Sequence, residues 1–311
     1  MKKIIGLGNC LVDSLVKLAD NGMLLQLGLP VGSMQLIDKR EKEKIDDCVA
    51  RMDVGRVPGG SAANTIKALA RNGVEVGFIG KIAADANGDF FASTLEKVGV
   101  KTFLTRGEGE ATGVANTFIS PDGQRTFATY LGISGSLGVS EVKAEMLDGY
   151  DIVSVEGYLV QNRELVEFVM SEAKKRGMEV CLDLASYNIV EENLDFFNHL
   201  LKDYVDIVFA NEEESRALTS ALPEEALAVL GGMCATAVVK LGARGSSARR
   251  GAETVVVSAQ KVERVVDTTG AGDYFAAGFL EGYIKGESLA ECLERGGSLS
   301  AEVIQVIGCP I

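Results

Sequence analysis

The stretch that decides the fold is Val266-Asp267-Thr268-Thr269-Gly270-Ala271-Gly272-Asp273-Tyr274-Phe275-Ala276-Ala277-Gly278-Phe279. Within it, Gly270 and Gly272 permit tight backbone turns and the close approach of a ligand. Thr268 and Thr269, just before them, are of a residue type that caps the start of a helix. Aromatic side chains then recur at a helical spacing, at Phe275, Phe279 and Tyr283. The stretch therefore predicts a glycine-containing loop that leads into the N-terminus of a helix.

The start of such a helix binds anions well, because unpaired backbone N–H groups and the positive end of the helix dipole meet there. Asp273 lies in the first predicted turn, beside those donors. An acidic residue at this position also stabilises the helix, and the residue alone is compatible with that simpler role. Donors for an anion together with a carboxylate that accepts a proton suit transfer of a phosphoryl group to an alcohol.

The segment from Asp267 to Asp273 resembles the C-terminal signature of the ribokinase-like (PfkB) sugar and nucleoside kinases. The resemblance implies that Asp273 is the catalytic base and that the backbone amides of Gly270, Ala271 and Gly272 form an anion hole. Other segments of that family, described below, occur in the same order along the whole chain. The resemblance therefore implies an ATP-dependent phosphotransferase in which Mg²⁺ bridges the phosphates.

Apolar runs and helical patterns alternate along the second half of the chain. Strands are predicted at 151–155, 179–184, 205–210 and 236–241, with helices at about 162–176, 212–219, 223–231 and 288–305. This order is typical of βαβ units, in which a parallel sheet is covered by helices on both faces. The predicted fold class is therefore α/β. The resemblance makes it a ribokinase-like fold, with a central, mostly parallel sheet and a small β-sheet lid.

The N-terminal half contains the predicted lid. Residues 111–119 and 125–130 alternate with a period of two around a Pro-Asp-Gly turn, which predicts a hairpin. Residues 29–38 alternate in the same way after a Pro-Gly break, and 39–51 predict a charged surface helix. We expect one ribokinase-like domain over residues 1–311, with lid insertions at about 14–38 and 101–133. A monomer, or a homodimer joined through the lid, is expected.

The composition excludes several classes of protein. The 311 residues are 47% hydrophobic, which is ample for a large core, and the formal net charge is −13. An acidic surface repels phosphate backbones, so no nucleic-acid partner is expected. His199 is the single histidine, which argues against histidine-based metal sites and against a Ser-His-Asp triad.

The cysteines and the apolar runs indicate a cellular compartment. Six cysteines are scattered along the chain without a Cys-x-x-Cys pair, which is typical of reduced cytosolic thiols. Cys10 and Cys181 lie in apolar, strand-like runs and are expected to be buried. No apolar stretch reaches membrane-spanning length, so we expect a soluble, cytoplasmic protein with no membrane partner.

Two early segments are candidates for binding the phosphate acceptor. Asp13 follows a predicted strand at residues 4–8, where open α/β sheets bind ligands, although a turn or capping role fits equally well. Gly59 and Gly60 precede a predicted helix, where they either let the backbone approach a ligand or simply turn the chain. The resemblance implies that the substrate is bound by Asp13, Gly59, Gly60 and Asn64.

Two later segments are candidates for binding ATP. Asn211 and Glu214 follow a predicted buried strand, and by themselves they indicate a helix N-cap with an acid in the first turn. The resemblance implies that both residues help to position magnesium and phosphate, mostly through water. The next strand ends in a glycine loop that the resemblance places against the phosphates and ribose of ATP, at Lys240, Gly242 and Gly245.

The resemblance also implies a monovalent cation, K⁺, held mainly by main-chain carbonyls. The matching positions lie around the glycine-containing loop and after the last helix, at Asp267, Thr269, Val303, Val306 and Gly308.

The identity of the acceptor rests on resemblance. The segments Asn9 to Asp13 and Gly32 to Met34 look most like the adenosine-kinase branch, and an Asn and an Arg that many members carry after the Asp at 183 are absent. Aromatic side chains at Phe118, Phe127 and Tyr130 could pack on the substrate or belong to the sheet core. We expect the acceptor to be a primary hydroxyl of an adenosine-like ribonucleoside, with a free-sugar kinase of the ribokinase or fructokinase type as the alternative.

Two other classes of protein are disfavoured. A protein that binds a sugar or nucleoside without catalysis would be expected to have lost Asp273, which is present. A dinucleotide oxidoreductase would carry a third glycine after Gly6-Leu7-Gly8, and none follows at the required spacing.

Overall fold

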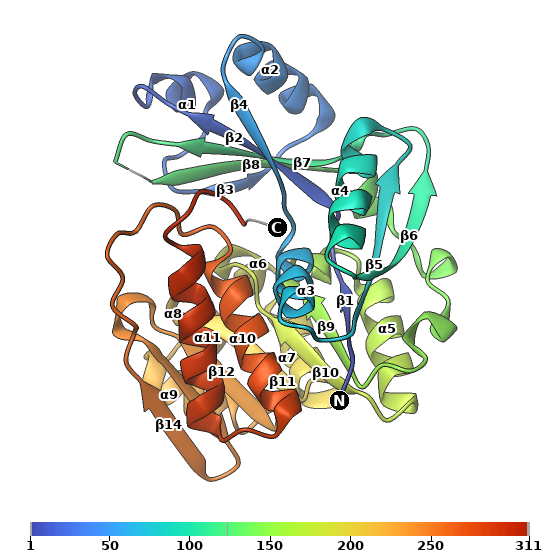
Figure 1. Cartoon of the computed structure of the whole chain (residues 1–311), viewed down its shortest axis with the longest axis vertical. Helices are drawn as coiled ribbons and strands as arrows, with labels where there is room; N and C mark the ends of the chain where they lie inside the picture. The colour runs from blue at the N-terminus through green and yellow to red at the C-terminus, as the bar shows by residue number, and fades with distance from the viewer. Residues whose placement is uncertain (1, 123, 310–311) are drawn as a thin grey trace.

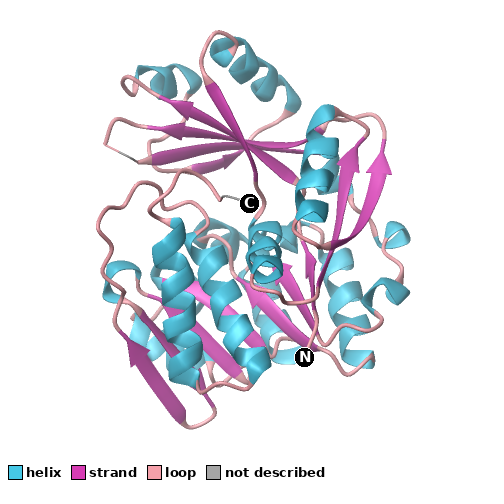
Figure 2. Ribbon diagram, viewed as in Figure 1, coloured by secondary structure: helices cyan, strands magenta, loops and turns pink. Residues whose placement is uncertain are grey.

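The computed structural model of the chain describes residues 2–122 and 124–309 and places them around two β-sheets (Figures 1 and 2). The larger sheet has nine strands in the order β14-β13-β12-β11-β10-β9-β1-β5-β6. Their bounds are β1 (Ile4–Leu7), β5 (Val76–Ala83), β6 (Lys101–Gly107), β9 (Ile152–Glu156), β10 (Glu179–Asp183), β11 (Ile207–Asn211), β12 (Thr236–Lys240), β13 (Ser246–Arg250) and β14 (Glu253–Val257).

Most neighbours in the large sheet are parallel, which confirms the predicted α/β fold class. The run from β6 to β12 is parallel throughout, with Ile4 of β1 opposite Val76 of β5 and Ile152 of β9. The last two strands, β13 and β14, are antiparallel. Residues 251–252 alone separate them, which suffices for a hairpin but not for the crossover that a parallel pair needs.

Helices cover both faces of the large sheet, because successive side chains of a strand point to opposite faces. On β1, Ile5 and Leu7 pack into one core and Ile4 into the other. The face of Ile5 is covered by α5 (Arg163–Lys175), α6 (Tyr187–Glu192), α7 (Leu194–Asp203), α8 (Glu212–Thr219) and α9 (Pro223–Leu230). The face of Ile4 is covered by α3 (Ser61–Arg71), α4 (Ala86–Lys97), α10 (Ala271–Lys285) and α11 (Leu289–Val303).

The second sheet lies at one end of the molecule, where α4 of the large sheet contacts it (Figure 1). Its strand order is β3-β8-β7-β2-β4, with bounds β2 (Leu11–Lys17), β3 (Met34–Leu36), β4 (Val54–Pro58), β7 (Thr112–Ile119) and β8 (Arg125–Gly132). β7 and β8 form the predicted antiparallel hairpin. One face of this sheet packs against α1 (Gly22–Leu27) and α2 (Lys39–Val49) in a small core of its own.

The second sheet does not have the bounds of the predicted lid insertions. Residues 101–107 form β6, which pairs with β5 in the large sheet, so the predicted insertion at 101–133 begins too early. β4, which was not predicted as part of the lid, pairs with β2 at its edge. The short helix α1 and the helices α6 and α7 were also not predicted. Asp13 lies within β2 rather than at the end of β1, because the chain re-enters an extended conformation after Asn9.

The helices α10 and α11 lie side by side (Figure 1) at a distance that glycine makes possible. A Cβ atom added to Gly278 of α10 would lie 2.5 Å from the carbonyl oxygen of Arg295. A Cβ atom added to Gly296 of α11 would lie 2.8 Å from the carbonyl oxygen of Phe275. A side chain at either position would therefore force the two helices apart.

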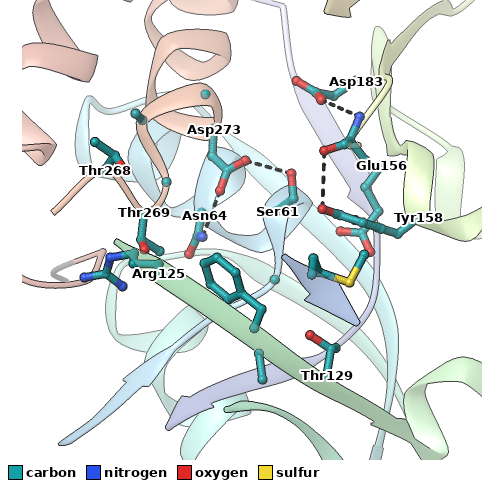
Figure 3. Close-up of a pocket in the computed structure, with 18 of the residues that line it drawn as sticks. Ser61, Asn64, Arg125, Thr129, Glu156, Tyr158, Asp183, Thr268, Thr269 and Asp273 are labelled. Carbon is teal, nitrogen blue, oxygen red and sulfur yellow. Dashed lines mark hydrogen bonds between the residues drawn. The ribbon is translucent and has the colours of Figure 1, made fainter. Parts of the chain in front are cut away.

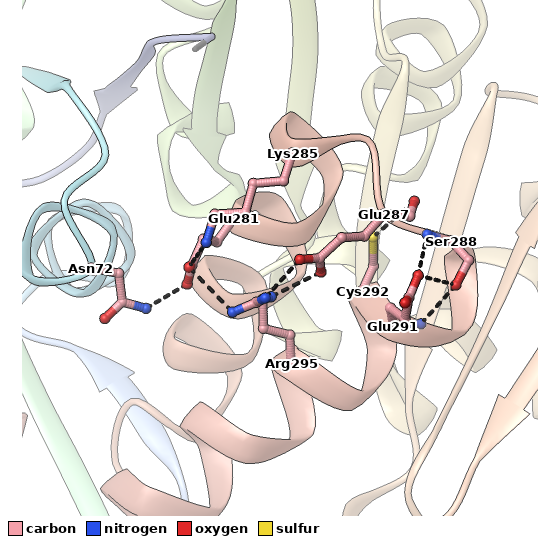
Figure 4. A network of polar contacts seen from close by, with 8 residues as sticks. All are labelled: Asn72, Glu281, Lys285, Glu287, Ser288, Glu291, Cys292 and Arg295. Carbon is pink, nitrogen blue, oxygen red and sulfur yellow. Dashed lines mark hydrogen bonds and ion pairs between the residues drawn. The ribbon is translucent and has the colours of Figure 1, made fainter.

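A polar network joins the far ends of these helices to α3 (Figure 4). The buried carboxylate of Glu281 accepts from Asn72 Nδ2 at 2.5 Å, Lys285 Nζ at 2.5 Å and Arg295 Nη1 at 3.3 Å. Asn72 is the C-cap residue of α3. The network fixes α3 relative to α10, whose opposite ends meet at the candidate site described next.

Candidate active site

A cavity of about 850 Å³ lies between the two sheets. Strand and loop ends of the large sheet, the N-termini of α3 and α10, and one face of the second sheet line it. Many of the residues predicted from the sequence meet here: Asp13, Gly60, Asn64, Asn211, Glu214, Lys240, Gly242, Thr269, Gly270, Ala271, Gly272 and Asp273. The others lie outside the cavity lining: Gly59, Gly245, Asp267, Val303, Val306 and Gly308.

Asp273 is held in place by α3 (Figure 3). Its Oδ1 accepts from Ser61 Oγ at 2.7 Å and its Oδ2 accepts from Asn64 Nδ2 at 2.9 Å, while its main-chain oxygen accepts from Thr65 Oγ1 at 3.2 Å. Burial raises the pKa of Asp273 to about 6, and the bonds from Asn64 and Ser61 oppose that rise by favouring the carboxylate. Asp273 is therefore ionised at neutral pH and can accept a proton.

The loop before α10 presents backbone amides to the cavity. Gly270 is the N-cap residue, in the left-handed conformation at φ 73°, which favours glycine. Within residues 2–122 and 124–309, the amides of Gly270 and Gly272 have no acceptor, whereas Ala271 N donates to Thr268 O at 3.2 Å. Two of the three predicted anion-hole amides are thus free to bind an anion, and the third is engaged in a long bond.

Thr268 and Thr269 do not cap α10, contrary to the sequence-based expectation. Gly270 separates them from the helix and makes no side-chain cap itself. The hydroxyl of Thr269 is buried and finds no partner among the described residues.

The two glycines before α3 bring the backbone against Asp13 and Asn9. A Cβ atom on Gly59 would lie 2.0 Å from Asp13 Oδ1, and one on Gly60 would lie 2.5 Å from the carbonyl oxygen of Asn9. Gly60 also has a φ of 87°, so a side chain would be strained there. Gly59 therefore packs against Asp13 and does not line the cavity.

The carboxylate of Asp13 is buried among charged groups. Burial raises its pKa to about 7, Lys67 and Arg125 lower the pKa, and Asp273 and Asp267 raise it. Asn64 also lines the cavity, and its buried Oδ1 has no donor among the described residues. Asp13 and Asn64 therefore offer free acceptors for the hydroxyl groups of a ligand.

Asn211 and Glu214 form the capping box that starts α8. Asn211 Oδ1 accepts from Glu214 N at 2.8 Å, and Glu214 Oε2 accepts from Asn211 N at 2.8 Å. The helix-capping interpretation is correct, and both side chains also line the cavity. Burial raises the pKa of Glu214 to about 7, and the ammonium of Lys240 lowers it.

Lys240 reaches the anion-binding loop. Its Nζ donates to Asp183 Oδ2 at 2.8 Å and lies 3.0 Å from the point where a Cβ atom of Gly272 would be. Gly242 lines the cavity nearby. Gly245 instead makes the turn into β13, at φ 105°, where a Cβ atom would lie 2.0 Å from the carbonyl oxygen of Val257.

The positions predicted to hold K⁺ come together around Asp267. Its Oδ1 accepts from Thr269 N at 2.7 Å, and its Oδ2 accepts from Gly308 N at 2.6 Å. The carbonyl of Ile304 accepts from Val266 N at 2.8 Å. The segments 266–269 and 303–309 are therefore adjacent, with Val303 buried and Val306 exposed.

Several residues of the site were missed by sequence reasoning. Arg125 starts β8, lines the cavity and forms an ion pair with Asp267. Glu156, at the end of β9, accepts from Asn9 N at 2.8 Å, Asn9 Nδ2 at 2.7 Å and Ala62 N at 3.0 Å, and burial raises its pKa to about 7. The period of two along β8 could have identified Arg125, since it shares the strand face of Phe127.

The same period separates the two interpretations of the aromatic residues, contact with the substrate or packing in the sheet core. Arg125, Phe127, Thr129 and Leu131 of β8 line the cavity, and the alternate residues do not. Phe118 is fully buried in the core under α1 and α2, and Tyr130 is buried away from the cavity lining. Of the three aromatic residues, Phe127 alone faces the candidate site.

The donor set offers carboxylates but no ready-made metal cage. Within residues 2–122 and 124–309, no group of three or more His, Cys, Asp or Glu side chains could hold a metal ion. The nearby carboxylates of Glu214 and Asp183 suit Mg²⁺, which keeps several waters and takes its remaining ligands from substrate phosphates.

Comparison with known proteins identifies the family. Residues 29–311 match the pfkB family carbohydrate kinase, so the chain belongs to this family. It is a sugar or nucleoside kinase, an enzyme that transfers phosphate to an alcohol, and membership of the family implies the use of ATP. The described part of the chain contains no helix with the length and apolar character needed to span a bilayer.

The relatives include both sugar and nucleoside kinases. An uncharacterised sugar kinase of Archaeoglobus fulgidus is 29% identical over 250 residues, which covers 77% of this chain and 95% of the relative. The structure of a probable sugar kinase from Rhizobium etli superposes with a TM-score of 0.92 at 32% identity, covering 99% of this chain and 94% of that chain. The structure of an adenosine kinase from Sinorhizobium meliloti superposes with a TM-score of 0.93 at 34% identity, covering 100% and 96%.

Proposed function

We propose that this kinase phosphorylates a primary hydroxyl of a ribonucleoside, adenosine or one like it, with ATP as the donor. The observation that carries this proposal is the division of the cavity into two parts. Most of its acidic and amide side chains come from the large sheet and the helices and loops beside it, whereas most of its apolar side chains come from the second sheet, which also contributes Asp13 of β2. A ribose has hydroxyls for the first part, and a nucleobase has flat apolar faces for the second.

Asp273 would act as the general base. It removes the proton of the primary hydroxyl as the oxygen attacks the γ-phosphorus, and the bond between that phosphorus and ADP breaks. Ser61 and Asn64 hold the carboxylate at the N-terminus of α10, so it needs little reorganisation during the reaction. Asp13 and Asn64 would hold the acceptor through its other hydroxyls.

The free amides of Gly270 and Gly272 would stabilise the charge on the transferred phosphoryl group. Lys240 and Gly242 would lie against the phosphates of ATP, with Asn211 and Glu214 positioning a hydrated Mg²⁺ and its phosphates. Bound Mg²⁺ would supply neutralising charge on the phosphate oxygens. The second sheet would act as a lid that keeps water, a competing acceptor, away from the phosphoryl group.

The apolar part of the cavity favours a nucleoside over a free sugar. It is lined by Leu11, Met34, Leu36, Phe127 and Leu131 of the second sheet and by Ile189 of α6. A free pentose would leave these side chains against water or against unsatisfied hydroxyls, which costs free energy. A base stacked on Phe127 would cover them.

One observation favours the alternative, a free-sugar kinase of the ribokinase or fructokinase type. Asn9 lines the cavity, and its buried Oδ1 has no donor among the described residues. An additional sugar hydroxyl could donate to this oxygen. A nucleoside would use the apolar side chains of the cavity, whereas a free sugar would use Asn9 Oδ1.

A screen of acceptors tests the proposal. ADP release would be measured in a coupled assay with nucleosides, pentoses, hexoses and their monophosphates. We expect a ribonucleoside to give the highest kcat/KM, and Phe127→Ala to raise the KM for the nucleoside more than the KM for any free sugar. Tyr130→Phe, on the opposite face of the same strand, is the control. If a free sugar gave a higher kcat/KM than every nucleoside, the proposed acceptor would be a sugar instead of a nucleoside. The kinase assignment would remain intact.

Three further elements belong to the proposal. K⁺ would bind between segments 266–269 and 303–308, where Asp267, Thr269, Val303, Val306 and Gly308 were predicted to hold it. All six cysteines are free, which is consistent with a reducing cytoplasm. The enzyme would be a monomer or a homodimer joined through the second sheet.

A further inference from the structure

Lys67 of α3 carries a positive charge into the interior of the molecule. Its side chain is fully buried, and it is among the largest buried side chains of the chain. Burying an ammonium group costs several kcal/mol, about the stability of a small domain, unless opposite charges and hydrogen bonds compensate. The groups around Lys67 must therefore compensate for the buried charge.

The contacts of Lys67 lead to the acceptor side of the candidate site. Its Nζ donates to the carbonyl oxygen of Pro58 at 3.0 Å. Pro58 ends β4 and is followed by Gly59, whose Cα supports the carboxylate of Asp13: a Cβ atom there would meet Asp13 Oδ1 at 2.0 Å. The Lys67 ammonium and the Asp13 carboxylate thus lie against two neighbouring residues, Pro58 and Gly59.

The face of α3 that carries Lys67 is the face that holds Asp273. Asn64 precedes Lys67 by three residues, so both lie on one side of the helix, and Asn64 Nδ2 donates to Asp273 Oδ2 at 2.9 Å. α3 therefore directs an amide to the candidate base and a cation toward Asp13.

The electrostatic surroundings agree with this geometry. The groups that act on Asp13 are Lys67 of α3, Asp273 of α10, Arg125 of β8 and Asp267 of the loop before α10. Lys67 has the largest effect of these charges, and it lowers the pKa of Asp13. Burial lowers the pKa of Lys67, Cys309, Asp13 and Asp273 counteract that lowering, and Arg71 adds to it.

We propose that Lys67 is a positioning residue, the internal counter-ion that favours the ionised form of Asp13 and holds it in place to accept hydrogen bonds from the hydroxyls of the acceptor. The role rests on the proposed function of Asp13 as an acceptor-binding residue. Lys67 itself does not line the cavity, so we expect it to act through Asp13 and not by contact with either substrate.

A double-mutant cycle in stability tests the pairing without any assay of activity. Unfolding of Lys67→Met, Asp13→Asn and the double variant would be followed by thermal and urea denaturation. Each single change leaves one buried charge uncompensated, so the double variant should be more stable than the sum of the single losses predicts. Additive losses would overturn the proposal. The control cycle pairs Asp13→Asn with Lys81→Met, because Lys81 is bound to Glu141 at 2.9 Å, and it should be additive.

Should Lys67→Met fail to fold, the double variant decides. A cooperative unfolding transition in Lys67→Met/Asp13→Asn supports the proposal, because the unpaired carboxylate was then the cause of the failure. Failure of the double variant while Asp13→Asn folds would overturn it and assign Lys67 to packing alone.

A pH profile separates the counter-ion role from a merely structural one. In the folded Lys67→Met enzyme, the pH at which the KM for the acceptor reaches its low plateau should rise by about one to three pH units. The KM at high pH should approach that of the unchanged enzyme. A loss of the same size at every pH would overturn the proposal. The proposed function of Asp13 could be wrong on its own. In that case the stability cycle would still show coupling, but the KM of the Asp13→Asn enzyme for the acceptor would be unchanged.

Discussion

Arg125 and Asp267 form a buried ion pair that joins the second sheet to the loop before α10. Arg125 is the first residue of β8, and Asp267 lies two residues before Thr269, whose buried hydroxyl has no partner among the described residues. Asp267 also accepts from Thr269 N and Gly308 N. One carboxylate therefore links the candidate lid, the anion-binding loop and the segment after α11.

Arg125→Met should destabilise the fold strongly. It removes the cation and leaves Asp267 buried, and breaking a buried pair from one side costs about 3–5 kcal/mol. Asp267→Asn in the same chain should restore part of that loss. The free energy of unfolding in urea is the measurement. Arg106→Met is the control, because Arg106 pairs with Asp89 at the surface, where a pair contributes about 0–1 kcal/mol. Equal effects at the two positions would contradict the prediction.

Asp273→Asn should keep the affinity for both substrates and lose about 10²–10⁴-fold in kcat, because it removes the base alone. Asparagine can still receive the hydrogen bond from Ser61, so the site should stay assembled. Calorimetric binding of ADP and of the acceptor checks affinity, and single-turnover kinetics check the rate. A turnover near that of the unchanged enzyme would remove Asp273 from the role of base.

The pH dependence of the unchanged enzyme should report the same group. Burial raises the pKa of Asp273 to about 6, so the base is ionised above that pH and protonated below it. We expect kcat/KM to fall on the acid side, near pH 6 or above, since Asp13 and Glu156, with pKa values of about 7, also become protonated there. Activity that stays constant down to pH 4.5 would contradict this assignment.

The large sheet and the loop before α10 were predictable, because their signals are local. Alternation of apolar runs and helices, and glycines at strand ends, determine βαβ units whatever lies elsewhere in the chain. The start of α10 could be located for the same reason. The predicted caps at Thr268 and Thr269 were wrong because a left-handed Gly270 follows them, a conformation that composition does not reveal.

The rest of the site depends on contacts between distant segments. Ser61 and Asp273 are 212 residues apart, and Lys67 lies beside Pro58 because β4 joins the second sheet. A lysine at position 67 fits the polar pattern of an exposed helix as well as it fits a buried pair. The bounds of the lid failed for a related reason: β6 alternates like a lid strand but extends the large sheet.

Gly296 and Gly297 are adjacent in α11 and should respond oppositely to substitution. A Cβ atom at Gly296 would lie 2.8 Å from the carbonyl oxygen of Phe275, whereas one at Gly297 would meet nothing within 4 Å. Gly296→Ala should cost about 1–3 kcal/mol through overpacking. Gly297→Ala should stabilise the helix by up to about 1 kcal/mol. Thermal unfolding of both variants checks the pair, and stabilisation by Gly296→Ala would show that α10 and α11 are less closely packed than described.

Potassium should raise the activity above that in a choline buffer without potassium or sodium, if K⁺ binds between segments 266–269 and 303–308. Arg125 already places one cation beside Asp267, so the proposed site relies on carbonyl oxygens for the rest of its ligands. Initial rates over a titration of KCl at constant ionic strength measure the effect. A titration without any change in rate would remove K⁺ from the proposed cofactors.

Gly59→Ala should weaken the binding of the acceptor far more than the binding of ATP. A methyl group at this position would lie 2.0 Å from Asp13 Oδ1, so the carboxylate has to move away from the place where hydroxyls would meet it. A displacement of this size at a group that orients a substrate costs on the order of 10²-fold in kcat/KM. The KM for ATP should stay near its normal value. The residues proposed to lie against ATP, Lys240 and Gly242, belong to β12 and η5 (Gly242–Arg244), whereas the three atoms nearest to a Cβ on Gly59 all belong to Asp13. Gly297→Ala serves again as the control for adding a methyl group to a glycine in open space. If Gly59→Ala changed both KM values equally, Gly59 would support the fold in general rather than Asp13 in particular.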